Sequence, residues 1–219
     1  MPTMKITKKY YFSVEGDTEK WYLDWLQEQI NNEPLAKYKV SIDSKIQKNP
    51  LKRAKSMNVL SKVEITHLCD YESKDEVHTT QFKETLDLLK ETSKLGKLIK
   101  YNLGYTNFTF ELWMVLHKTI CNGLLSHRRQ YLEPINREFD EDFENLHQYK
   151  HKANFKRVLG KISFPEVKSA IERAKTIMQR NEENDLVLQQ YKGYQYYIEN
   201  PSLSIWKSIE KILKDCELM

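Results

Sequence analysis

Three acidic residues stand within five positions near the start of this sequence. The segment YYFSVEGDTEKWYLDWL, residues 10–26, runs from an apolar, strand-prone stretch into Glu15, Asp17 and Glu19 and then into a helical pattern. Carboxylates held so close repel one another, and the repulsion costs free energy. Water or a bound cation would offset that cost, so this turn is a candidate metal-binding segment.

A second acidic group follows another apolar segment. The residues VEITHLCD predict a strand that ends in Asp70, and Glu72 comes two positions later, so both carboxylates face the same side of an extended chain. In an open parallel sheet, ligands bind beyond the carboxyl ends of the strands. If these two strands are neighbours, the candidate metal ligands Glu15, Glu19, Asp70 and Glu72 converge at one edge of the sheet.

Such a group of carboxylates needs a counter-charge, and hard oxygen ligands select Mg²⁺ or Mn²⁺. Two such ions suit in-line phosphoryl transfer, in which one activates water and the other stabilises the leaving oxygen. The spacing alone leaves an alternative open. In that alternative, Glu19 complements the dipole of its helix, and Asp70 and Glu72 are turn and surface residues.

The apolar periodicity predicts the elements that would position these acids. Strands are expected at residues 9–15, 39–46, 63–70 and 97–103, and helices at residues 19–31, 50–61, 79–94 and 107–118. This alternation favours an α/β fold with a mainly parallel sheet and helices on its faces. Beyond residue 120 the pattern is helical. We therefore expect an α/β core over residues 1–120 and a mostly helical portion over residues 121–219 that packs on it.

The composition excludes several classes of protein. The 219 residues contain no apolar run close to the roughly 20 residues of a membrane span, and the N-terminus lacks the apolar core of a signal peptide, so we expect a cytoplasmic protein without a membrane partner. Three cysteines without paired spacing indicate neither a disulfide framework nor a zinc site. No P-loop and no Gly-x-Ser-x-Gly motif occurs. The net charge of +4 permits a nucleic-acid partner without requiring one.

Basic residues cluster in the helical half of the chain. Such clusters are usually solvated surface, but an enzyme that acts on nucleic acid must hold a polyanion, and phosphate contacts come mostly from lysine and arginine. Lys152 is the first to test, as a phosphate contact or as a charge stabiliser near the metal ions. The candidate nucleic-acid-binding residues are Arg128, Arg129, Lys152, Lys156 and Arg157.

Four motifs, in order along most of the chain, resemble those of the RloB-like proteins, which belong to the TOPRIM superfamily. VEGDTEKWYL resembles the opening motif, shared in looser form by OLD-type nucleases. THLCDYESKDE resembles the second element, an apolar strand followed by Asp-x-Asp. TNFTFELWMVLHK is similar to the third motif, Asn-Pro-x-Phe-Glu-x-Trp with a following His, and ENPSLSIWKSIEKIL to a closing Asn-Pro-Ser-Thr segment.

The resemblance implies a TOPRIM-like fold and a nuclease dependent on Mg²⁺ or Mn²⁺ that acts in restriction or phage abortive infection. It also implies an ATPase partner protein. RNA (tRNA included) and DNA both stay open as substrates, and so does a homo-oligomer. Glu15 matches the family's catalytic glutamate, Glu19 matches a metal ligand of OLD-type relatives, and Asp70 matches the first aspartate of Asp-x-Asp. The third motif is matched by Asn107, Phe110, Glu111, Trp113 and His117.

Two departures from the family pattern support a rival hypothesis. Glu72 stands where an aspartate is expected, and its extra methylene shifts the oxygens that a near-octahedral Mg²⁺ would need, although Asp75 would substitute if the loop folded back. Phe108 replaces the usual proline of the third motif. The rival is a catalytically inactive module of a defence system, which binds nucleic acid or an ATPase partner.

The residues of the third motif have two interpretations each. Glu111 is either a solvated helix position or, following the resemblance, a catalytic residue. Asn107 is first a helix cap and second a substrate contact. His117 on an apolar face is more often a core histidine than a base, and Trp113 and Trp25 are expected in the core.

Overall fold

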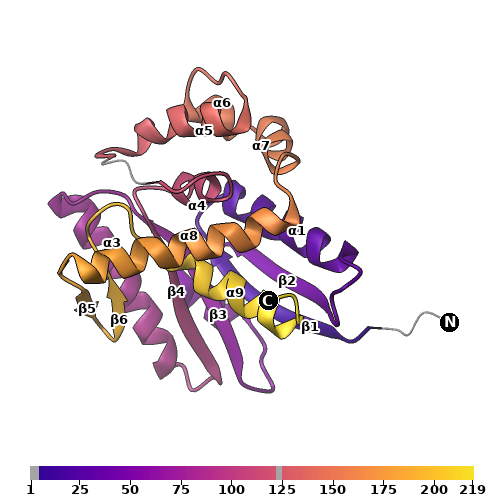
Figure 1. Cartoon of the computed structure of the whole chain (residues 1–219). Coiled ribbons are helices and arrows are strands. Elements are labelled where there is room, and N and C mark those ends of the chain that lie inside the picture. Colours follow the sequence, from indigo (N-terminus) through magenta and orange to yellow (C-terminus); the bar gives the residue numbers. More distant parts are fainter. Residues whose placement is uncertain (1–4, 122–124) are drawn as a thin grey trace.

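A parallel four-stranded sheet forms the centre of the computed structural model, which describes residues 5–121 and 125–219 (Figure 1). The strands lie in the order β2-β1-β3-β4, and each pairs with its neighbour in parallel. Their bounds are β1 Thr7–Val14, β2 Lys39–Ile46, β3 Val63–Tyr71 and β4 Ile99–Asn107. The predicted α/β fold with a mainly parallel sheet is therefore confirmed.

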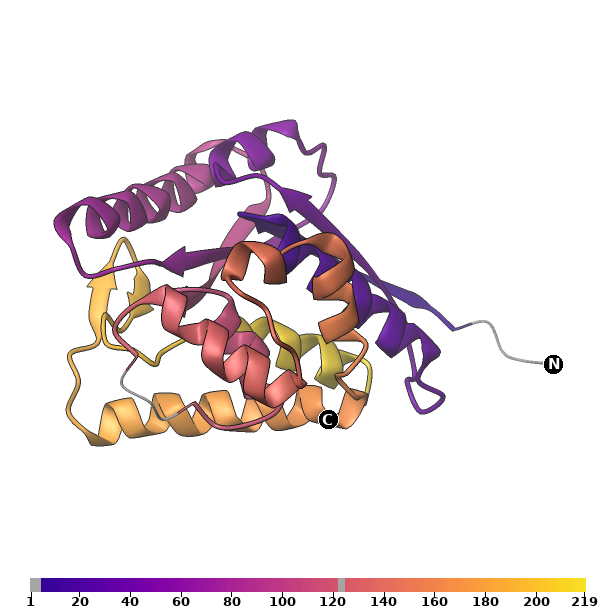
Figure 2. The ribbon, with the colours of Figure 1, turned by 90° about the horizontal axis from the view of Figure 1, so that it is seen from above.

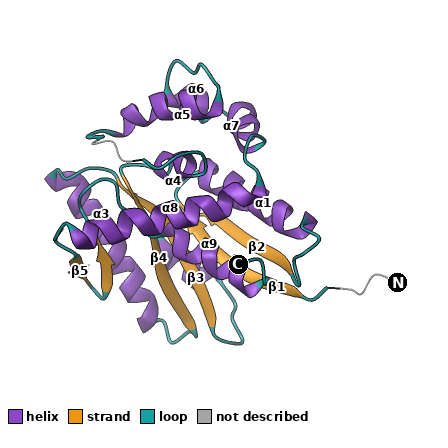
Figure 3. Ribbon diagram, in the orientation of Figure 1, coloured by secondary structure: helices purple, strands orange, loops and turns teal. Residues whose placement is uncertain are grey.

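Helices cover both faces of this sheet and the carboxyl ends of its strands (Figure 3). They are α1 Asp17–Asn32, α2 Pro50–Ser56, α3 Glu76–Glu91, α4 Glu111–Leu116, α5 Leu132–Phe139, α6 Leu146–Tyr149, α7 Lys152–Leu159, α8 Phe164–Glu183 and α9 Ile205–Asp215, with short 3₁₀ turns at Thr92–Lys94 and Arg128–Tyr131. The helical C-terminal region is confirmed. The sequence pattern missed one element there, an antiparallel hairpin of β5 Gln189–Tyr191 and β6 Tyr194–Tyr196. Within the described ranges, every helix falls short of the length and apolarity that crossing a bilayer requires.

The alternation of side chains along the strands divides the core between the two faces. Phe12, Val14 and Leu68 face a large cluster formed with α1, α4, α8 and α9. Ile65 and Tyr101 face a second cluster formed with α2 and α3. The large cluster extends to the C-terminal helix, so the helical half and the sheet share one core. The predicted boundary at residue 120 stays a prediction.

Helices α5, α6 and α7 lie above the carboxyl ends of the strands, as the two perpendicular views show (Figures 1 and 2). Their buried side chains, among them Ile135, Tyr149 and Phe155, join the large core cluster. The basic residues predicted to bind nucleic acid lie in or beside these helices. The fold therefore places a helical cover over the edge where ligands of parallel sheets bind.

The predicted start of the fourth helix at Asn107 is wrong. Asn107 is the last residue of β4 and pairs with Tyr71, and α4 begins only at Glu111. The side chain of Asn107 donates to the carbonyl of Glu199, and its backbone N–H donates to Ser202, so it does not cap the helix. Sheet pairing extends the strand beyond the point where local pattern suggested a helix.

Phe108 has a backbone conformation that proline cannot adopt. Its φ is 61°, in the left-handed region, whereas the proline ring holds φ near −65°. The side chain of Phe108 is buried in the large core cluster. Phe108 therefore replaces the usual proline of the third motif together with a left-handed backbone conformation, and burial of its ring helps to stabilise that conformation.

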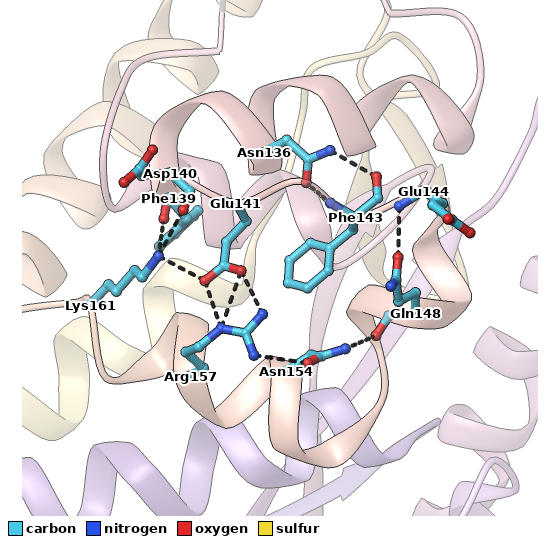
Figure 4. A network of polar contacts seen from close by, with 10 residues as sticks. All are labelled: Asn136, Phe139, Asp140, Glu141, Phe143, Glu144, Gln148, Asn154, Arg157 and Lys161. Atoms are coloured by element: carbon cyan, nitrogen blue, oxygen red, sulfur yellow. Dashed lines mark hydrogen bonds and ion pairs between the residues drawn. The ribbon is translucent and has the colours of Figure 1, made fainter.

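Glu141 joins α5 to α7 through a group of ion pairs (Figure 4). Its side chain is only 7% exposed, and both of its oxygens accept hydrogen bonds from the guanidinium of Arg157, Oε1 from Nε at 3.0 Å and Oε2 from Nε at 3.2 Å and from Nη2 at 2.6 Å. Lys161 Nζ lies 2.7 Å from Oε1. Hydrogen bonds from Arg157 lower the pKa of Glu141 to about 2, with Lys161 adding to the effect against the opposing cost of burial.

We expect Glu141→Gln to lower the free energy of unfolding at pH 7 by about 1–3 kcal/mol, because it removes a charged hydrogen-bond acceptor from a nearly buried site. The pKa is lowered in the folded state, so this stabilisation is present above the ordinary value of 4.5 and is lost as pH falls toward 2. Urea unfolding of the wild type and the variant at several pH values measures this pH dependence of the free energy of unfolding. The control is Glu133→Gln, at an 85% exposed side chain. A wild-type–variant difference that does not change with pH would contradict the account.

Candidate functional site

Glu15 and Asp70 lie together at the carboxyl ends of adjacent strands. Strands β1 and β3 are neighbours with Val14 opposite Leu68, so the residues that follow emerge side by side. The backbone N–H of Asp70 donates to Glu15 Oε2 at 3.4 Å. The carboxylate of Asp70 also accepts a 2.5 Å hydrogen bond from the hydroxyl of Thr106 on β4.

Glu19 enters the same edge from the first turn of α1. Its side chain is buried and accepts a 3.0 Å hydrogen bond from Thr18. Gly16 precedes the helix, and a Cβ at this position would lie 3.1 Å from Glu19 Oε2. The Glu-Gly-Asp-Thr-Glu turn therefore leaves room for the carboxylate because position 16 has no side chain.

Glu111 completes the group at the start of α4. It is fully buried, and the hydroxyl of Thr109 donates to its Oε2. This burial excludes the interpretation of Glu111 as a solvated helix position. We define the carboxylate cluster as Glu15, Glu19, Asp70 and Glu111.

The pKa values show that the members of the carboxylate cluster affect one another. Burial raises the pKa of Glu15 to about 7, and the charges of Glu19 and Glu72 add to that rise. Burial also raises the pKa of Asp70 well above its usual range, with the charges of Glu19 and Glu15 contributing. Burial likewise raises the pKa of Glu19, and the charge of Glu111 adds to that rise. Ionising the whole cluster therefore requires a cation.

Lys150 supplies one positive charge to this cluster. Its Nζ lies 3.1 Å from Glu111 Oε1, an ion pair without the alignment of a hydrogen bond, and its side chain is 40% exposed. Burial lowers the pKa of Lys150, but the charges of Glu111, Asp70 and Glu19 outweigh burial and raise it.

The sequence pattern predicts Lys152 near the acids, and the structure places Lys150 there instead. Lys152 is the exposed first residue of α7, and no ion pair involves it among the described residues. Lys150 directly follows α6, so the end of that short helix decides which lysine of the segment Lys150–Lys152 points to the cluster.

Tyr149 is a second residue that sequence analysis missed. It is fully buried, and its hydroxyl has no hydrogen-bond partner in the described part of the chain. Burial raises its pKa well above the usual range, and the charges of Glu111 and Glu19 raise it further. A buried hydroxyl without a partner beside two carboxylates is a free donor at the cluster.

A basic pocket of about 630 Å³ adjoins the cluster and shares Lys150 with it. It is lined by Arg128, Arg129, Leu132, Glu144, Asn145, Leu146, His147 and Lys150. Two of the predicted nucleic-acid-binding residues, Arg128 and Arg129, therefore line the same pocket as Lys150, the residue that pairs with Glu111. Lys156 is exposed on α7 and does not line the pocket, and Arg157 is held by Glu141. A pocket with this charge suits a phosphate group.

Glu72 lies between the pocket and the cluster. Its side chain is 39% exposed and lies 2.8 Å from Arg128 Nη1, while its charge contributes to the raised pKa of Glu15. Asp75 does not fold back to join it. Asp75 caps α3 by accepting from the backbone N–H of His78, whose ring it also contacts at 2.6 Å.

His117 and Trp113 are core residues, as their apolar surroundings indicated. Both are fully buried in the core. His117 Nδ1 lies 3.0 Å from the carbonyl of Trp113, and its Nε2 lies 3.1 Å from the hydroxyl of Tyr22. Burial lowers the pKa of His117 to about 4, which keeps the ring neutral at physiological pH. Trp25 is half-buried against the same core.

The donor chemistry of the cluster fits Mg²⁺ or Mn²⁺, although the side chains are not drawn together around one point. Within the described residues, no three or more His, Cys, Asp or Glu side chains are already grouped to hold a metal ion. All four carboxylates nevertheless offer the oxygen ligands that these ions prefer, and the hydroxyl of Tyr149 has no hydrogen-bond partner among the residues that the structure describes. Glu15, Glu19 and Asp70 are the residues that would hold an ion.

Comparison with known proteins agrees with the order of motifs in the chain. Residues 10–212 match the family model described as RloB-like protein. The matched range includes all four carboxylates, Lys150 and the basic pocket. A search of curated proteins found no significant match. A search of solved structures likewise found none.

Proposed function

The chain belongs to the RloB-like protein family, and we propose that it hydrolyses phosphodiester bonds of a nucleic acid with Mg²⁺ or Mn²⁺ as cofactor. One observation carries this proposal: four buried or half-buried carboxylates at the carboxyl edge of a parallel sheet adjoin a basic pocket of phosphate-binding composition. Acids and cations in this arrangement suit a reaction in which a polyanion must approach a carboxylate site.

The acids have distinct tasks in this proposal. A bound ion would supply an activated water and stabilise the leaving oxygen. Glu19 and Asp70 would hold the ion, and Glu15 would serve either as a further ligand or as the base that takes a proton from the attacking water. Glu111 is oriented by the hydroxyl of Thr109 and lies within reach of Lys150.

The cations bind and orient the substrate. Arg128 and Arg129 line the pocket and would contact phosphate oxygens, which positions the chain without reading its bases. Lys150 lies between this pocket and Glu111, so its ammonium would face the negative charge that develops on the reacting phosphate.

We expect Arg129→Gln to raise the KM for cleavage about five- to tenfold and to leave kcat within twofold, because Arg129 contacts a phosphate away from the reacting bond. The slope of log KM against log salt should fall by about 0.7, the value for one phosphate contact with a single strand. The control is Lys90→Gln, an exposed lysine on α3. A fall in kcat with unchanged KM would contradict a binding role.

The family resemblance supports a biological setting for this activity. We propose that the chain acts in defence against phage, as part of a restriction or abortive-infection system with an ATPase partner. The chain's cytoplasmic location and self-association belong to the same proposal. Co-purification with the product of a neighbouring ATPase gene tests it.

A catalytically inactive module remains the second candidate, and two observations favour it. Glu72 replaces the expected aspartate and is paired with Arg128. Lys150 already supplies the counter-charge to Glu111. Incubation with single-stranded RNA, tRNA and DNA in Mg²⁺, Mn²⁺ or EDTA separates the two candidates. Cleavage that requires a divalent ion and is lost in Glu15→Gln supports the nuclease. Binding without cleavage under every condition supports the inactive module.

A further inference from the structure

An open groove of about 1030 Å³ lies at the opposite ends of the strands from the carboxylate cluster. It is formed by β1, β3 and β4, by α9 and by the turn of the β5–β6 hairpin. In Figure 1 the lower parts of β3 and β4 extend beyond α9, on the face that α9 covers higher up. Along β4, about 20 Å separate Lys100, at the outer end of the groove, from Thr106, which bonds Asp70.

The strand register shows that the floor of the groove is polar. Phe12 lies opposite Thr66, and Thr66 lies opposite Asn102, so these three side chains share one face. One step lower on the same face, Glu64 lies opposite Lys100. Parallel sheets are normally covered on both faces and built there from aliphatic residues. Phe12 and Thr66 are buried under α9, whereas Asn102 is half-buried and Glu64 and Lys100 are exposed, so the sheet faces solvent at this end.

The rim of the groove carries an excess of positive charge. Its lining contains two carboxylates, Glu64 and Asp215, and six lysines, which are Lys8, Lys9, Lys62, Lys100, Lys207 and Lys211. Lys211 is paired with Asp215 at 2.8 Å, and Lys100 lies 3.8 Å from Glu64. Lys62 and Lys207 are exposed and have no carboxylate partner among the described residues, whereas Lys9, next to Tyr10 on β1, faces the other side of the sheet. Lys62 and Lys207 are therefore available for an anionic ligand.

Aromatic rings lie among these lysines. Tyr10 is half-buried, with its hydroxyl bound to Asp215 at 3.0 Å and Lys211 Nζ above its ring at 5.9 Å. Tyr194, at the start of β6, is half-buried at the hairpin side of the groove. Tyr10 packs on the large core cluster and Tyr194 on the second, so both rings support the walls of a positively charged groove, the feature that follows the backbone of single-stranded nucleic acid.

We propose that this groove binds a single-stranded segment of nucleic acid, away from the bond that is cleaved. The proposal rests on the proposed function in one respect, that the chain acts on nucleic acid. The volume is at the upper limit of pockets for small ligands, and the two lysines without a carboxylate partner lie in the loop before β3 and on α9, so a chain of several nucleotides fits better than one nucleotide. The groove would hold the part of the substrate that flanks the reacting segment.

The test measures binding without cleavage. Fluorescence anisotropy in EDTA, with a labelled single-stranded oligonucleotide of about 20 nucleotides, compares the wild type with the groove variant Lys62→Gln, Lys207→Gln. We expect the dissociation constant to rise about fivefold or more and the salt slope to fall by about 1.4, which corresponds to two phosphate contacts on a single strand. The control variant Lys90→Gln, Lys94→Gln removes the same charge from exposed positions elsewhere and should stay within twofold of the wild type.

Several outcomes would overturn the proposal. Equal weakening by the groove variant and the control variant would mean that only net charge matters. An unchanged dissociation constant in the groove variant would mean that the groove is not used. Displacement of the oligonucleotide by polyglutamate at equal charge concentration would indicate an acidic protein segment as the ligand. Because binding is measured in EDTA, a chain that never cleaves would refute the nuclease and still leave the groove result readable.

Discussion

Replacing Asp70 by Asn is expected to lower the rate of nucleic-acid cleavage by about a thousandfold or more while the chain stays folded. The substitution keeps an oxygen for the hydroxyl of Thr106 and removes the negative charge at the centre of the carboxylate cluster. Acids that act together on one reaction lose most of their effect when one is removed. Single-turnover cleavage at saturating protein measures the loss in the chemical step.

The same substitution should raise the melting temperature in EDTA. Burial raises the pKa of Asp70 well above its usual range, and the charges of Glu19 and Glu15 raise it further, so the metal-free folded state disfavours the ionised carboxylate and the amide removes that cost. In the wild type, Mg²⁺ far above its dissociation constant should stabilise the fold by about 1–3 kcal/mol, and Asp70→Asn should lose that effect. The control is Asp17→Asn, an exposed acid in the same turn. Full cleavage by Asp70→Asn would show that the cluster is not catalytic.

Lys150→Met is expected to lower kcat about a hundredfold with a smaller effect on KM. The substitution removes the ammonium that lies 3.1 Å from Glu111 and lines the phosphate-binding pocket. A hundredfold fall in kcat is typical for the loss of one electrostatic contact to a transition state. Lys150→Arg should recover part of the activity because it restores the charge. Lys152→Met is the matched control two residues away, at an exposed side chain, and should stay within twofold of the wild type.

The reverse pattern would contradict the structure. A large loss in Lys152→Met with normal activity in Lys150→Met would mean that the segment after α6 is placed differently in the active protein. A loss in Lys150→Met that is fully reversed by Glu111→Gln would show that Lys150 serves only to neutralise Glu111. Melting temperatures of all three variants separate these cases from loss of folding.

The positions of the two acids at the edge of the sheet could be predicted because the sequence patterns that place them are local. Apolar strands that end in Glu15 and Asp70, and a helical pattern after Gly16, place both acids at strand ends without knowledge of the rest of the chain. The strand order then brings them together, since β1 and β3 are neighbours. Burial of Glu111 could not be predicted from periodicity alone, because the helix that carries it is covered on every side.

The contribution of the helical half could not be predicted from local pattern. Tyr149 and Lys150 reach the cluster because α5, α6 and α7 fold over the strand ends, and a charge pattern in the sequence does not say which lysine points inward. Asn107 was misassigned because pairing with β3 extends β4 through that residue. The β5–β6 hairpin was missed because its two strands have only three residues each, and the one buried residue among them, Tyr196, packs on the distant Tyr71 and Phe82.

Calorimetric titration with Mn²⁺ tests the central claim most directly, that the carboxylate cluster is a divalent-cation site. The account predicts saturable binding of one or two ions by the wild type and by Asp17→Asn, and loss of that binding in Glu15→Gln and Asp70→Asn. Mn²⁺ suits this experiment because it prefers the same oxygen ligands as Mg²⁺ and generally binds them more tightly. Absence of saturable binding by the wild type at millimolar Mn²⁺, or equal binding by all four proteins, would contradict it.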